Sequence, residues 1–397
     1  MKPRVLLVGT AYAIREHRKK LELLAGYFDL TCVTARECRG FDWVETAEAE
    51  SPGPYRLVAL PIAGAASAGT RCWYRGMTAV FRAGRYDLIF VENEPWGVLR
   101  WQSWLLKNLF QRKAVFGEFT WENILRGGWK AWVSGVVYRM AARTSDLVIG
   151  GNRDAVEIMR RHGSSPAGAV CIPQFGVDTD HFSALSEVDK RRARKDAGLP
   201  EDAFLIGFGG RLIPEKGVRD LRDAFLRLEP ARTDIRLLIM GSGDLEPELR
   251  EASREDARIQ LWPPRKHSEV AQFLQLLDLL VLPSRTVAGP RVWWKEQFGH
   301  ILIEAMACGA VAVGSDCGAI PEVLDDPAVI FPAGEVSALV ALLQNLVVRQ
   351  EGLGAIRARQ RARVLATYSQ AAVADQWARV FLRQIAGRKK VPPEAKP

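Results

Sequence analysis

The sequence predicts an α/β protein made of two doubly wound, Rossmann-like domains. Its 397 residues are enough for two domains of ordinary size, and 48% of them are hydrophobic, which allows two substantial cores. Short apolar runs alternate with helical patterns in two separate series, and the alternation pauses once, at PQFGVDTDHF. Strands that alternate with helices in this way favour parallel sheets covered by helices.

The first series supplies the strands of the first domain. The apolar runs VLLVGT, LTCVTA, DLIFVE, KAVFGEF and DLVIGG lie at 5–10, 30–35, 87–92, 113–119 and 146–151. The opening residues have the basic end and apolar run of a secretory signal, but the run breaks at Gly9 and REHRKK follows instead of a small-residue cleavage site. The opening run therefore predicts the first strand, and HRKKLELLAGYF predicts the helix after it.

The second series begins after the charged helical pattern EVDKRRARKDAGL. Its apolar runs lie at 204–212, 235–243, 259–262, 278–284, 310–316 and 328–333. Helical patterns lie between them, at 217–228, 269–277 and 300–309. This repeats the rhythm of the first series and predicts a second parallel sheet.

Composition and charge indicate which kinds of ligand and partner the protein can bind. The six cysteines are scattered without a CxxC or CxxH pair, which argues against a zinc site and indicates free thiols in a reducing compartment. The net charge of +9 favours an anionic partner, such as a nucleotide, a phosphorylated acceptor or a membrane surface. Lys and Arg are dispersed without a nucleic-acid-binding motif, so nucleic acid is not expected. With no apolar stretch long enough to span a membrane, we expect a cytoplasmic protein, or one peripheral on the inner membrane face.

One carboxylate stands inside an apolar helical run and needs a partner. In KEQFGHILIEAMACG, residues 295–309, Glu304 lies between Ile303 and Ala305. An unpaired carboxylate is costly in an apolar interior, and the run leaves no polar stripe at helical spacing. We therefore expect Glu304 to face a ligand or a buried basic residue.

A glycine-rich turn and a helix start together suit a diphosphate. In GFGGRLIPEKG a strand ends in glycines and is followed by Arg211 and Lys216, whose charges match a diphosphate. Phe298, Gly299 and His300 lie where the later helix should begin, so unpaired backbone N–H groups would face an anion. A ligand with its diphosphate there could give sugar hydroxyls to Glu296 and its ribose diol to Glu304.

These motifs resemble those of the retaining glycosyltransferases of family 4, also called group 1. GGRLIPEKG resembles the donor phosphate loop of that family, and EQFGHILIEAMACG resembles its paired-glutamate motif. GSDCGAIPEVL resembles the strand and turn after it, and IPQFGVDTDHF the approach to the interdomain linker. The resemblance covers nearly the whole chain. It implies the GT-B fold, in which two Rossmann-like domains have a cleft between them.

The resemblance also implies the reaction and its residues. The protein would move a hexose-type sugar from a nucleotide-diphosphate sugar to a glycan or lipid-linked acceptor, with retention, in polysaccharide or glycolipid biosynthesis. Arg211 and Lys216 would hold the diphosphate, Glu296 the sugar and Glu304 the ribose. The remaining donor residues would be Gly210, Gly241, Pro264, Phe298, Gly299 and His300. The nucleotide sugar is a co-substrate, and no further cofactor is expected.

The resemblance further implies a discontinuous first domain. Residues 1–182 would form the acceptor-side domain, completed by a C-terminal helix at 369–386. Residues 183–368 would form the donor-binding domain. The tail, 387–397, has the composition of a disordered segment.

Two departures from the family concern the acceptor side. The family often has a glycine pair after its first strand, whereas GTAYAIREH here has Gly9 followed by Thr10. It also often has a His after the strand that corresponds to KAVFGEF, whereas EFTWENI stands here. Candidate replacements are Glu118, Trp121, Glu122 and Asn123.

The triplet DTD, Asp178–Asp180, has the spacing of a metal-binding DxD motif. It lies between the two strand series rather than at the end of a strand in a nucleotide-binding half, which favours a turn-and-cap role. Arg211, Lys216 and the helix start could neutralise the leaving diphosphate without a metal. We therefore expect no metal site and a metal-independent reaction.

Tryptophans and basic residues gather in one part of the first half. Trp96, Trp101, Trp104, Trp121, Trp129 and Trp132 lie here among Arg and Lys residues. Such a mixture suits a membrane interface. The same residues also fit ordinary sheet-covering helices with a basic outer face, and the pattern does not decide between the two.

Three other functions fit parts of the pattern. A sugar-nucleotide epimerase of the same fold would release and add back the nucleotide diphosphate, although the EQFGHILIEAMACG match disfavours it. A nucleotide-sugar-binding module without catalysis would tolerate substitution of Glu296, which a transferase would not. A Rossmann dehydrogenase is disfavoured because the first strand lacks GxGxxG.

Overall fold

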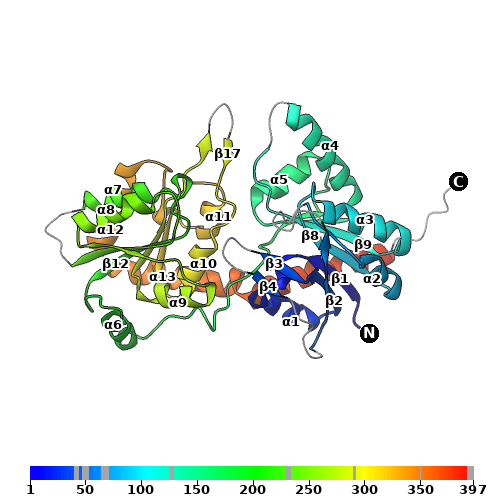
Figure 1. The fold of residues 1–397 in the computed structure, drawn as a ribbon, viewed down its shortest axis with the longest axis horizontal. Helices are drawn as coiled ribbons and strands as arrows, with labels where there is room; N and C mark the ends of the chain where they lie inside the picture. The colour runs from blue at the N-terminus through cyan, green and yellow to red at the C-terminus, as the bar shows by residue number, and fades with distance from the viewer. Residues whose placement is uncertain are drawn as a thin grey trace. The chain divides into compact units, whose positions relative to one another are not determined.

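The computed structural model describes residues 1–39, 44–46, 53–63, 71–125, 129–228, 234–288, 292–348 and 350–390. The chain forms two compact units (Figure 1). The first contains Met1–Gly176 and the C-terminal segment from Gln370, and the second contains Val177–Ser369. Each has one parallel sheet covered by helices, as the two series of apolar runs predict.

The first unit is built on a seven-stranded sheet in the order β11-β10-β9-β8-β1-β2-β5. Its strands are β1 (Arg4–Gly9), β2 (Asp29–Ala35), β5 (Arg56–Leu60), β8 (Leu88–Glu92), β9 (Val115–Thr120), β10 (Leu147–Gly150) and β11 (Ala169–Cys171). Its helices are α1 (Lys19–Ala25), α2 (Met77–Ala83), α3 (Val98–Phe110), α4 (Trp129–Thr144), α5 (Arg153–Arg161) and α14 (Gln370–Lys390). Two short hairpins, β3 (Glu37–Arg39) with β4 (Val44–Thr46) and β6 (Ile62–Ala63) with β7 (Trp73–Tyr74), lie outside the sheet.

The second unit is built on a six-stranded sheet in the order β14-β13-β12-β15-β18-β19. Its strands are β12 (Phe204–Gly209), β13 (Ile235–Met240), β14 (Ile259–Trp262), β15 (Leu279–Leu282), β18 (Val311–Ser315) and β19 (Ile330–Phe331). The helices are α6 (Glu187–Asp196), α7 (Val218–Leu226), α8 (Glu246–Glu255), α9 (His267–Leu276), α10 (His300–Ala307), α11 (Ile320–Leu324), α12 (Val336–Val348) and α13 (Gln350–Arg363). A separate hairpin joins β16 (Val287–Ala288) to β17 (Val292–Trp294).

Opposite faces of the first sheet pack against different helices. Alternate residues of a strand point to opposite faces. In β1, Val5 and Leu7 therefore belong to the core that α1 and α14 cover, and Leu6 and Val8 to the core that α2 and α3 cover. The C-terminal helix α14 contributes Trp377, Phe381 and neighbouring apolar residues to the first of these cores.

The structure places the unit boundaries a few residues from the sequence-based ones. The backbone N–H of Val177 donates to the Tyr368 carbonyl oxygen at 2.8 Å, and Val177 pairs with Ser369. The second unit therefore begins at Val177 and not after residue 182. Helix α14 continues to Lys390, so the first four residues of the predicted disordered tail are helical, and 391–397 lie outside the described residues.

Two further sequence expectations can be compared with the described part of the chain. Cys32, Cys72, Cys171, Cys308 and Cys317 are free thiols, as expected. None of the helices in the described ranges combines the length and the apolar character that crossing a bilayer requires.

Candidate functional site

Three strands of the first unit, β1, β8 and β9, end side by side at one edge of the sheet. The register pairs Gly9 of β1 with Glu92 of β8, and Glu92 with Phe119 of β9. A Cβ at Gly9 would lie 3.3 Å from the Cβ of Glu92 and from the Tyr12 ring, so a larger residue would crowd this edge. In parallel sheets ligands bind outside the carboxyl ends of the strands, which makes this edge the expected acceptor side.

A buried network surrounds Glu92. Its carboxylate accepts from the Tyr12 hydroxyl at 2.5 Å, from Lys20 Nζ at 2.9 Å and from Gln174 Nε2 at 2.7 Å. Burial lowers the pKa of Lys20 to about 8, although the neighbouring Glu92 carboxylate acts in the opposite direction and raises this pKa. Burial and Glu92 together raise the pKa of Tyr12 well above its ordinary value. This network is not among the features predicted from the sequence, although the carboxylate at the end of the apolar run DLIFVE could have indicated a polar site there.

Glu94 lies two residues further, in the loop between β8 and α3. It accepts from the Thr120 hydroxyl at 2.5 Å and from the Trp121 backbone N–H at 3.0 Å. Burial raises the pKa of Glu94 to about 7, and these two hydrogen bonds offset only part of that effect. Glu94 is a second carboxylate of this edge that the sequence analysis did not single out.

The raised pKa of Glu94 predicts a specific pH dependence of stability. Because the folded protein holds the Glu94 proton more tightly than the unfolded chain does, the free energy of unfolding should fall as pH rises from about 4.5 to about 7. Between about pH 5 and pH 7.5 the wild type should lose about 2 kcal/mol more than Glu94→Gln does. Chemical denaturation of both proteins across this range measures the difference, and parallel curves would contradict the prediction.

The predicted acceptor-side residues differ in their positions, hydrogen-bond partners and burial. Gly9 and Thr10 lie at the carboxyl end of β1. Trp121 donates from Nε1 to Gln174 Oε1 at 2.9 Å, which links it to the Glu92 network. Glu122 accepts from Trp96 Nε1 at 3.2 Å and from the Tyr138 hydroxyl at 3.1 Å. Asn123 is buried, with 6% of its surface exposed.

Glu118 corrects one acceptor-side prediction. Its side chain has no exposed surface and accepts from Arg100 Nε at 2.7 Å and from the Ser145 hydroxyl at 2.9 Å. Arg100 is buried as well. Glu118 belongs to β9 and points into the helix-covered interior, so it cannot contact an acceptor. Its role is to neutralise a buried arginine.

The basic and aromatic residues of the first unit also separate into buried and exposed groups. Arg100 and Lys107 are buried, and Trp101 packs against the α4–α5 core. Trp132, Leu105 and Leu109 are exposed. Residues 126–128 and the side chains of Trp129 and Lys130 lie outside the described part. The membrane interpretation therefore applies only to the exposed members.

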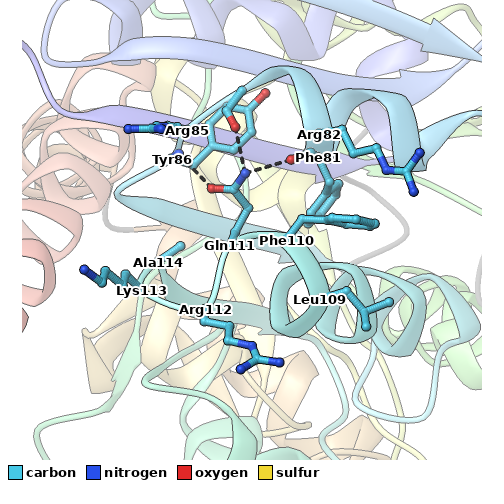
Figure 2. A pocket seen from close by; sticks show the side chains of 11 residues that line it. Phe81, Arg82, Arg85, Tyr86, Leu109, Phe110, Gln111, Arg112, Lys113 and Ala114 are labelled. Carbon is cyan, nitrogen blue, oxygen red and sulfur yellow. Dashed lines mark hydrogen bonds between the residues drawn. The ribbon is translucent and has the colours of Figure 1, made fainter. Parts of the chain in front are cut away.

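A basic hollow lies at the opposite, amino edge of the first sheet. The turns before β8 and β9 enclose about 630 Å³, with Arg82, Arg85, Arg112 and Lys113 among the lining residues (Figure 2). The side chain of Gln111 fixes its floor by donating to the Phe81 and Gly84 carbonyl oxygens at 2.7 Å. Within the described ranges none of the four cations forms an ion pair, so their charge is available to an anion.

The candidate donor site of the second unit lies where the strand order of its parallel sheet reverses, between β12 and β15. β12 has β13 on one side and β15 on the other, so the loops after β12 and β15 diverge at the carboxyl edge. Open parallel sheets bind ligands at such a switch point. The loop after β12 carries Arg211 and Lys216, and the segment after β15 leads to Glu296 and α10.

Glycines hold these two segments close together. Gly217, before α7, has φ +65°, and a Cβ there would lie 1.8 Å from the Pro283 carbonyl oxygen. Gly299, before α10, has φ +82°, and a Cβ there would lie 2.7 Å from Leu282 Cδ2. Positive φ and close approach both favour glycine. The glycines of the two sequence motifs therefore bring the β12 loop against the end of β15.

Lys216 and Glu296 meet as an ion pair. Lys216 Nζ donates to Glu296 Oε2 at 2.6 Å, and the Ser284 hydroxyl donates to the same oxygen at 2.8 Å. Glu296 is 7% exposed. The two residues are 80 positions apart in sequence, so only the fold brings them together. Ser284 is a further site residue that the sequence analysis did not identify.

Glu304 and Arg211 lie at a second position of the same edge. They line a pocket of about 360 Å³ with Gly210, Gly241 and Pro264, which the sequence analysis also assigned to the donor site. Glu304 is 8% exposed and accepts from His267 Nε2 at 2.9 Å. The partner of this buried carboxylate is thus His267 at the start of α9, whose side chain is 57% exposed, and not the buried basic residue that the sequence suggests.

Phe298, Gly299 and His300 lie at the start of α10, where a helix has unpaired backbone N–H groups. Phe298 is buried, and its ring lies 5.7 Å from that of Tyr368 and 4.7 Å from that of His300. Gly299 is the residue before the helix, so the first backbone N–H groups of α10 lie beside it. The assignment of Phe298 and Gly299 as sources of backbone amides for a diphosphate stays a prediction.

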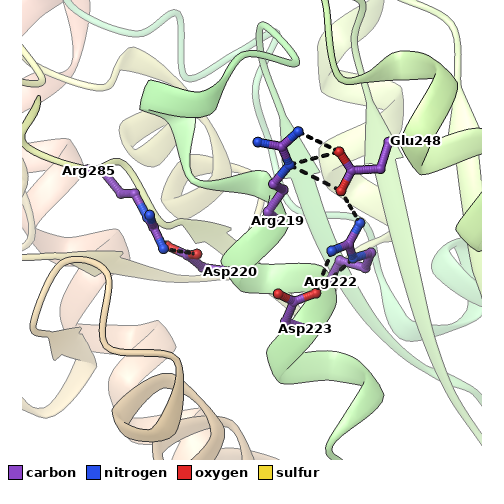
Figure 3. A network of polar contacts seen from close by, with 6 residues as sticks. All are labelled: Arg219, Asp220, Arg222, Asp223, Glu248 and Arg285. Atoms are coloured by element: carbon purple, nitrogen blue, oxygen red, sulfur yellow. Dashed lines mark hydrogen bonds and ion pairs between the residues drawn. The ribbon is translucent and has the colours of Figure 1, made fainter.

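An ion-pair network fixes α7 behind the Lys216 loop. Asp220, 3% exposed, accepts from Arg285 Nε at 2.6 Å, which ties α7 to the segment after β15 (Figure 3). Arg219 and Arg222 of the same helix both pair with Glu248 of α8. The helix that follows Lys216 is therefore held at both its site-facing and outer sides.

Asp178 has the turn-and-cap role that the sequence predicts. Its Oδ1 accepts from the backbone N–H groups of Asp180 at 3.1 Å and of His181 at 3.3 Å. In the described part of the chain, no group of three or more His, Cys, Asp or Glu side chains is arranged to hold a metal ion.

The second unit matches a known protein family. Residues 189–363 match the family described as glycosyl transferases group 1. A D-inositol 3-phosphate glycosyltransferase of Mycobacterium tuberculosis (strain ATCC 25618 / H37Rv) is 28% identical over 234 residues, which are 56% of this chain and 45% of that protein. The chain thus spans less than half the length of the curated relatives it matches.

Two solved structures resemble the chain over almost its full length. The sucrose-phosphate synthase of Thermosynechococcus elongatus matches with a TM-score of 0.71 and 19% identity, over 97% of this chain and 100% of that chain. The Anabaena protein HepE, in complex with UDP and glucose, matches with a TM-score of 0.66 and 17% identity, over 96% and 100%. The chain therefore has the predicted GT-B fold, and its residues 189–363 match the group 1 glycosyl transferase family.

Proposed function

We propose that this protein is a retaining glycosyltransferase. It would move a hexose-type sugar from a nucleotide-diphosphate sugar to a glycan or lipid-linked acceptor, in polysaccharide or glycolipid biosynthesis. The observation that carries the proposal is the Lys216–Glu296 pair at 2.6 Å, which lies at the switch point beside Arg211 and Glu304. The name of the mycobacterial relative and the UDP and glucose bound to HepE support the same reaction class.

Each donor residue has a chemical role in this proposal. Arg211 and Lys216 neutralise the diphosphate, whose negative charge grows as the bond to the sugar breaks. Glu296 accepts hydrogen bonds from the sugar hydroxyls, and Glu304 accepts from the ribose diol in place of His267. The backbone N–H groups at the start of α10, from Phe298 to His300, contact the diphosphate. Gly241 and Pro264 border the position of the base.

Ligand-induced stabilisation tests the donor assignment. A panel of nucleoside diphosphates and their sugar conjugates should contain at least one compound that raises the melting temperature of the wild type. Glu304→Ala should lose most of this shift, because it removes the proposed ribose acceptor. Arg219→Ala is the matched control, since Arg219 pairs with Glu248 on the outer side of α7. No shift with any compound would refute the donor site.

We expect the transfer reaction to survive removal of metal. The proposal assigns neutralisation of the diphosphate to Arg211, Lys216 and the α10 start, so no divalent cation is required. After dialysis against EDTA, the rate of sugar transfer should stay within about twofold of the untreated enzyme. Loss of activity that magnesium or manganese restores would overturn metal independence.

We further propose that the acceptor is presented at an anionic membrane surface. The exposed side chains Leu105, Leu109 and Trp132 could enter the interface, and the basic hollow could meet lipid phosphates. Leu109 and Arg112 both line that hollow, so apolar and basic groups meet at one end of α3. Lys107 is excluded from this surface because it is buried.

Membrane binding should depend on the basic hollow and on salt. Each Lys or Arg near an anionic surface contributes about 1 kcal/mol, so replacing Arg82, Arg85, Arg112 and Lys113 with Gln should abolish most binding. Flotation with anionic and neutral vesicles at low and high ionic strength measures it. Donor-induced stabilisation should be unchanged in the variant. Equal, negligible flotation of the wild type with both vesicles would indicate an acceptor in solution.

A further inference from the structure

The segment between β15 and α10 leaves the second sheet before it returns to the donor site. β16 and β17 pair antiparallel outside the six-stranded sheet, with Val287 opposite Trp294. The second strand ends at Trp294, and Glu296 follows two residues later. The hairpin therefore leads directly into the Lys216–Glu296 pair.

Both ends of the hairpin are anchored. At its start, the backbone N–H of Arg285 donates to the Glu215 carbonyl oxygen at 2.8 Å, and the Arg285 side chain pairs with buried Asp220 (Figure 3). At its end, the Glu296 carbonyl oxygen accepts from the Ala319 N–H at 3.0 Å. The described strands are thus held at a fixed place beside the candidate donor site.

The two tryptophans of β17 point to opposite faces, because successive strand residues alternate. Lys216 Nζ lies 5.4 Å from the centroid of the Trp294 ring, so Trp294 faces the Lys216–Glu296 pair. Trp293 is 57% exposed. An exposed indole on an anchored strand offers a flat surface at low entropic cost to a ligand.

We propose that Trp293 is a stacking platform for a pyranose ring of a carbohydrate acceptor. This inference rests on the proposed function, which places sugar transfer at the neighbouring Lys216–Glu296 pair. A pyranose has apolar C–H faces and a rim of hydroxyls, so one face can cover the negative face of an indole while the rim stays in water. The base of a nucleotide would bind elsewhere, since none of the described hairpin residues lines the pocket of Arg211 and Glu304.

Hydroxylated ligands fit this surface better than an acyl chain does. The hairpin adjoins charged Lys216, Glu296 and Arg285, and an acyl chain packed there would remove water from these charges without pairing them. A sugar ring can stack its C–H face on the indole and direct its hydroxyls to the polar groups around it. Trp293 would thus select acceptors that carry a pyranose next to the receiving hydroxyl.

Separate measurements of acceptor and donor use test the proposal. Trp293→Ala should raise the KM for a saccharide acceptor about tenfold, whereas Trp293→Phe should stay within about threefold of wild type. Hydrolysis of the nucleotide sugar without acceptor should change less than about twofold in both variants. Trp73→Ala, which removes a 49% exposed tryptophan of β7 in the first domain, is the matched control. Equal loss of hydrolysis and transfer would refute an acceptor role.

A direct binding measurement keeps this inference separate from the proposed function. The protein is labelled with 5-fluorotryptophan, and the ¹⁹F resonance of Trp293 is assigned by its loss in Trp293→Phe. Gluco-, galacto- and manno-configured trisaccharides are then titrated without any nucleotide sugar. At least one should shift the Trp293 resonance. No shift with any of them, or a shift with lipid vesicles alone, would overturn the stacking platform even if nucleotide-sugar hydrolysis is intact.

Discussion

Lys216→Ala and Arg211→Ala should each lower sugar transfer by about 30- to 1,000-fold. Each substitution removes one of the two charges that the proposal aims at the leaving diphosphate, which corresponds to about 2–4 kcal/mol of transition-state stabilisation. Lys216→Ala should have the larger effect, because it also leaves Glu296, 7% exposed, without its cationic partner. Steady-state assays of kcat and KM for the donor measure both variants.

The control for these variants lies on the helix that follows Lys216 and has the same charge. Arg219→Ala removes a cation that is paired with Glu248 outside the site, and it should leave transfer within about twofold of wild type. The double variant should lose less than the product of the two single effects, because both residues act on one diphosphate. Turnover of the double variant within a few-fold of wild type would place the chemistry elsewhere.

Trp377→Ala should destabilise the first domain by about 3–5 kcal/mol, the range measured for truncating large buried aromatic side chains. Trp377 has no exposed surface, and its Nε1 donates to the Pro173 carbonyl oxygen at 2.9 Å. Lys20 Nζ lies 3.2 Å from the centroid of its ring. The substitution would therefore open a cavity, leave a carbonyl unpaired and remove a contact of the Lys20–Glu92 pair.

Denaturation in guanidinium chloride, monitored by near-ultraviolet circular dichroism, measures this loss of stability. With two domains, the transition of the first domain should move to lower denaturant concentration while the transition of the second stays in place. Trp132→Ala provides the comparison, since Trp132 is 75% exposed and its loss should change stability by less than about 0.5 kcal/mol. If Trp377→Ala left both transitions unchanged, α14 would contribute little to the core of the first domain.

The donor half was more predictable from sequence than the acceptor half. Glycine-rich turns, a basic pair and a carboxylate in an apolar helix have meaning as local patterns, so Arg211, Lys216, Glu296 and Glu304 could be selected without a structure. The structure adds His267 and Ser284 as partners of the two glutamates. They could not be found from sequence because a serine after a strand and a histidine at the start of a helix are common.

The acceptor half shows where a local pattern misleads. Glu118 and Glu92 both stand in buried apolar strands, and nothing in the sequence distinguishes them. The side to which each strand residue points decides the difference: Glu118 meets buried Arg100, while Glu92 lies at the end of its strand with Tyr12 and Lys20. The direction of a side chain depends on the sheet and on the helix that covers it.

The two parallel sheets, the motifs of the candidate donor site and the turn role of Asp178 can be predicted from the sequence, because each depends on periodicity or on residues adjacent in the chain. The fold was needed to show the Lys216–Glu296 pair, the His267 partner of Glu304, the burial of Arg100 and Lys107, and the exposed Trp293 beside the candidate donor site. These features depend on contacts between residues that are distant in sequence. Local sequence patterns do not predict such contacts, since burial and pairing arise only when sheets, helices and loops pack together.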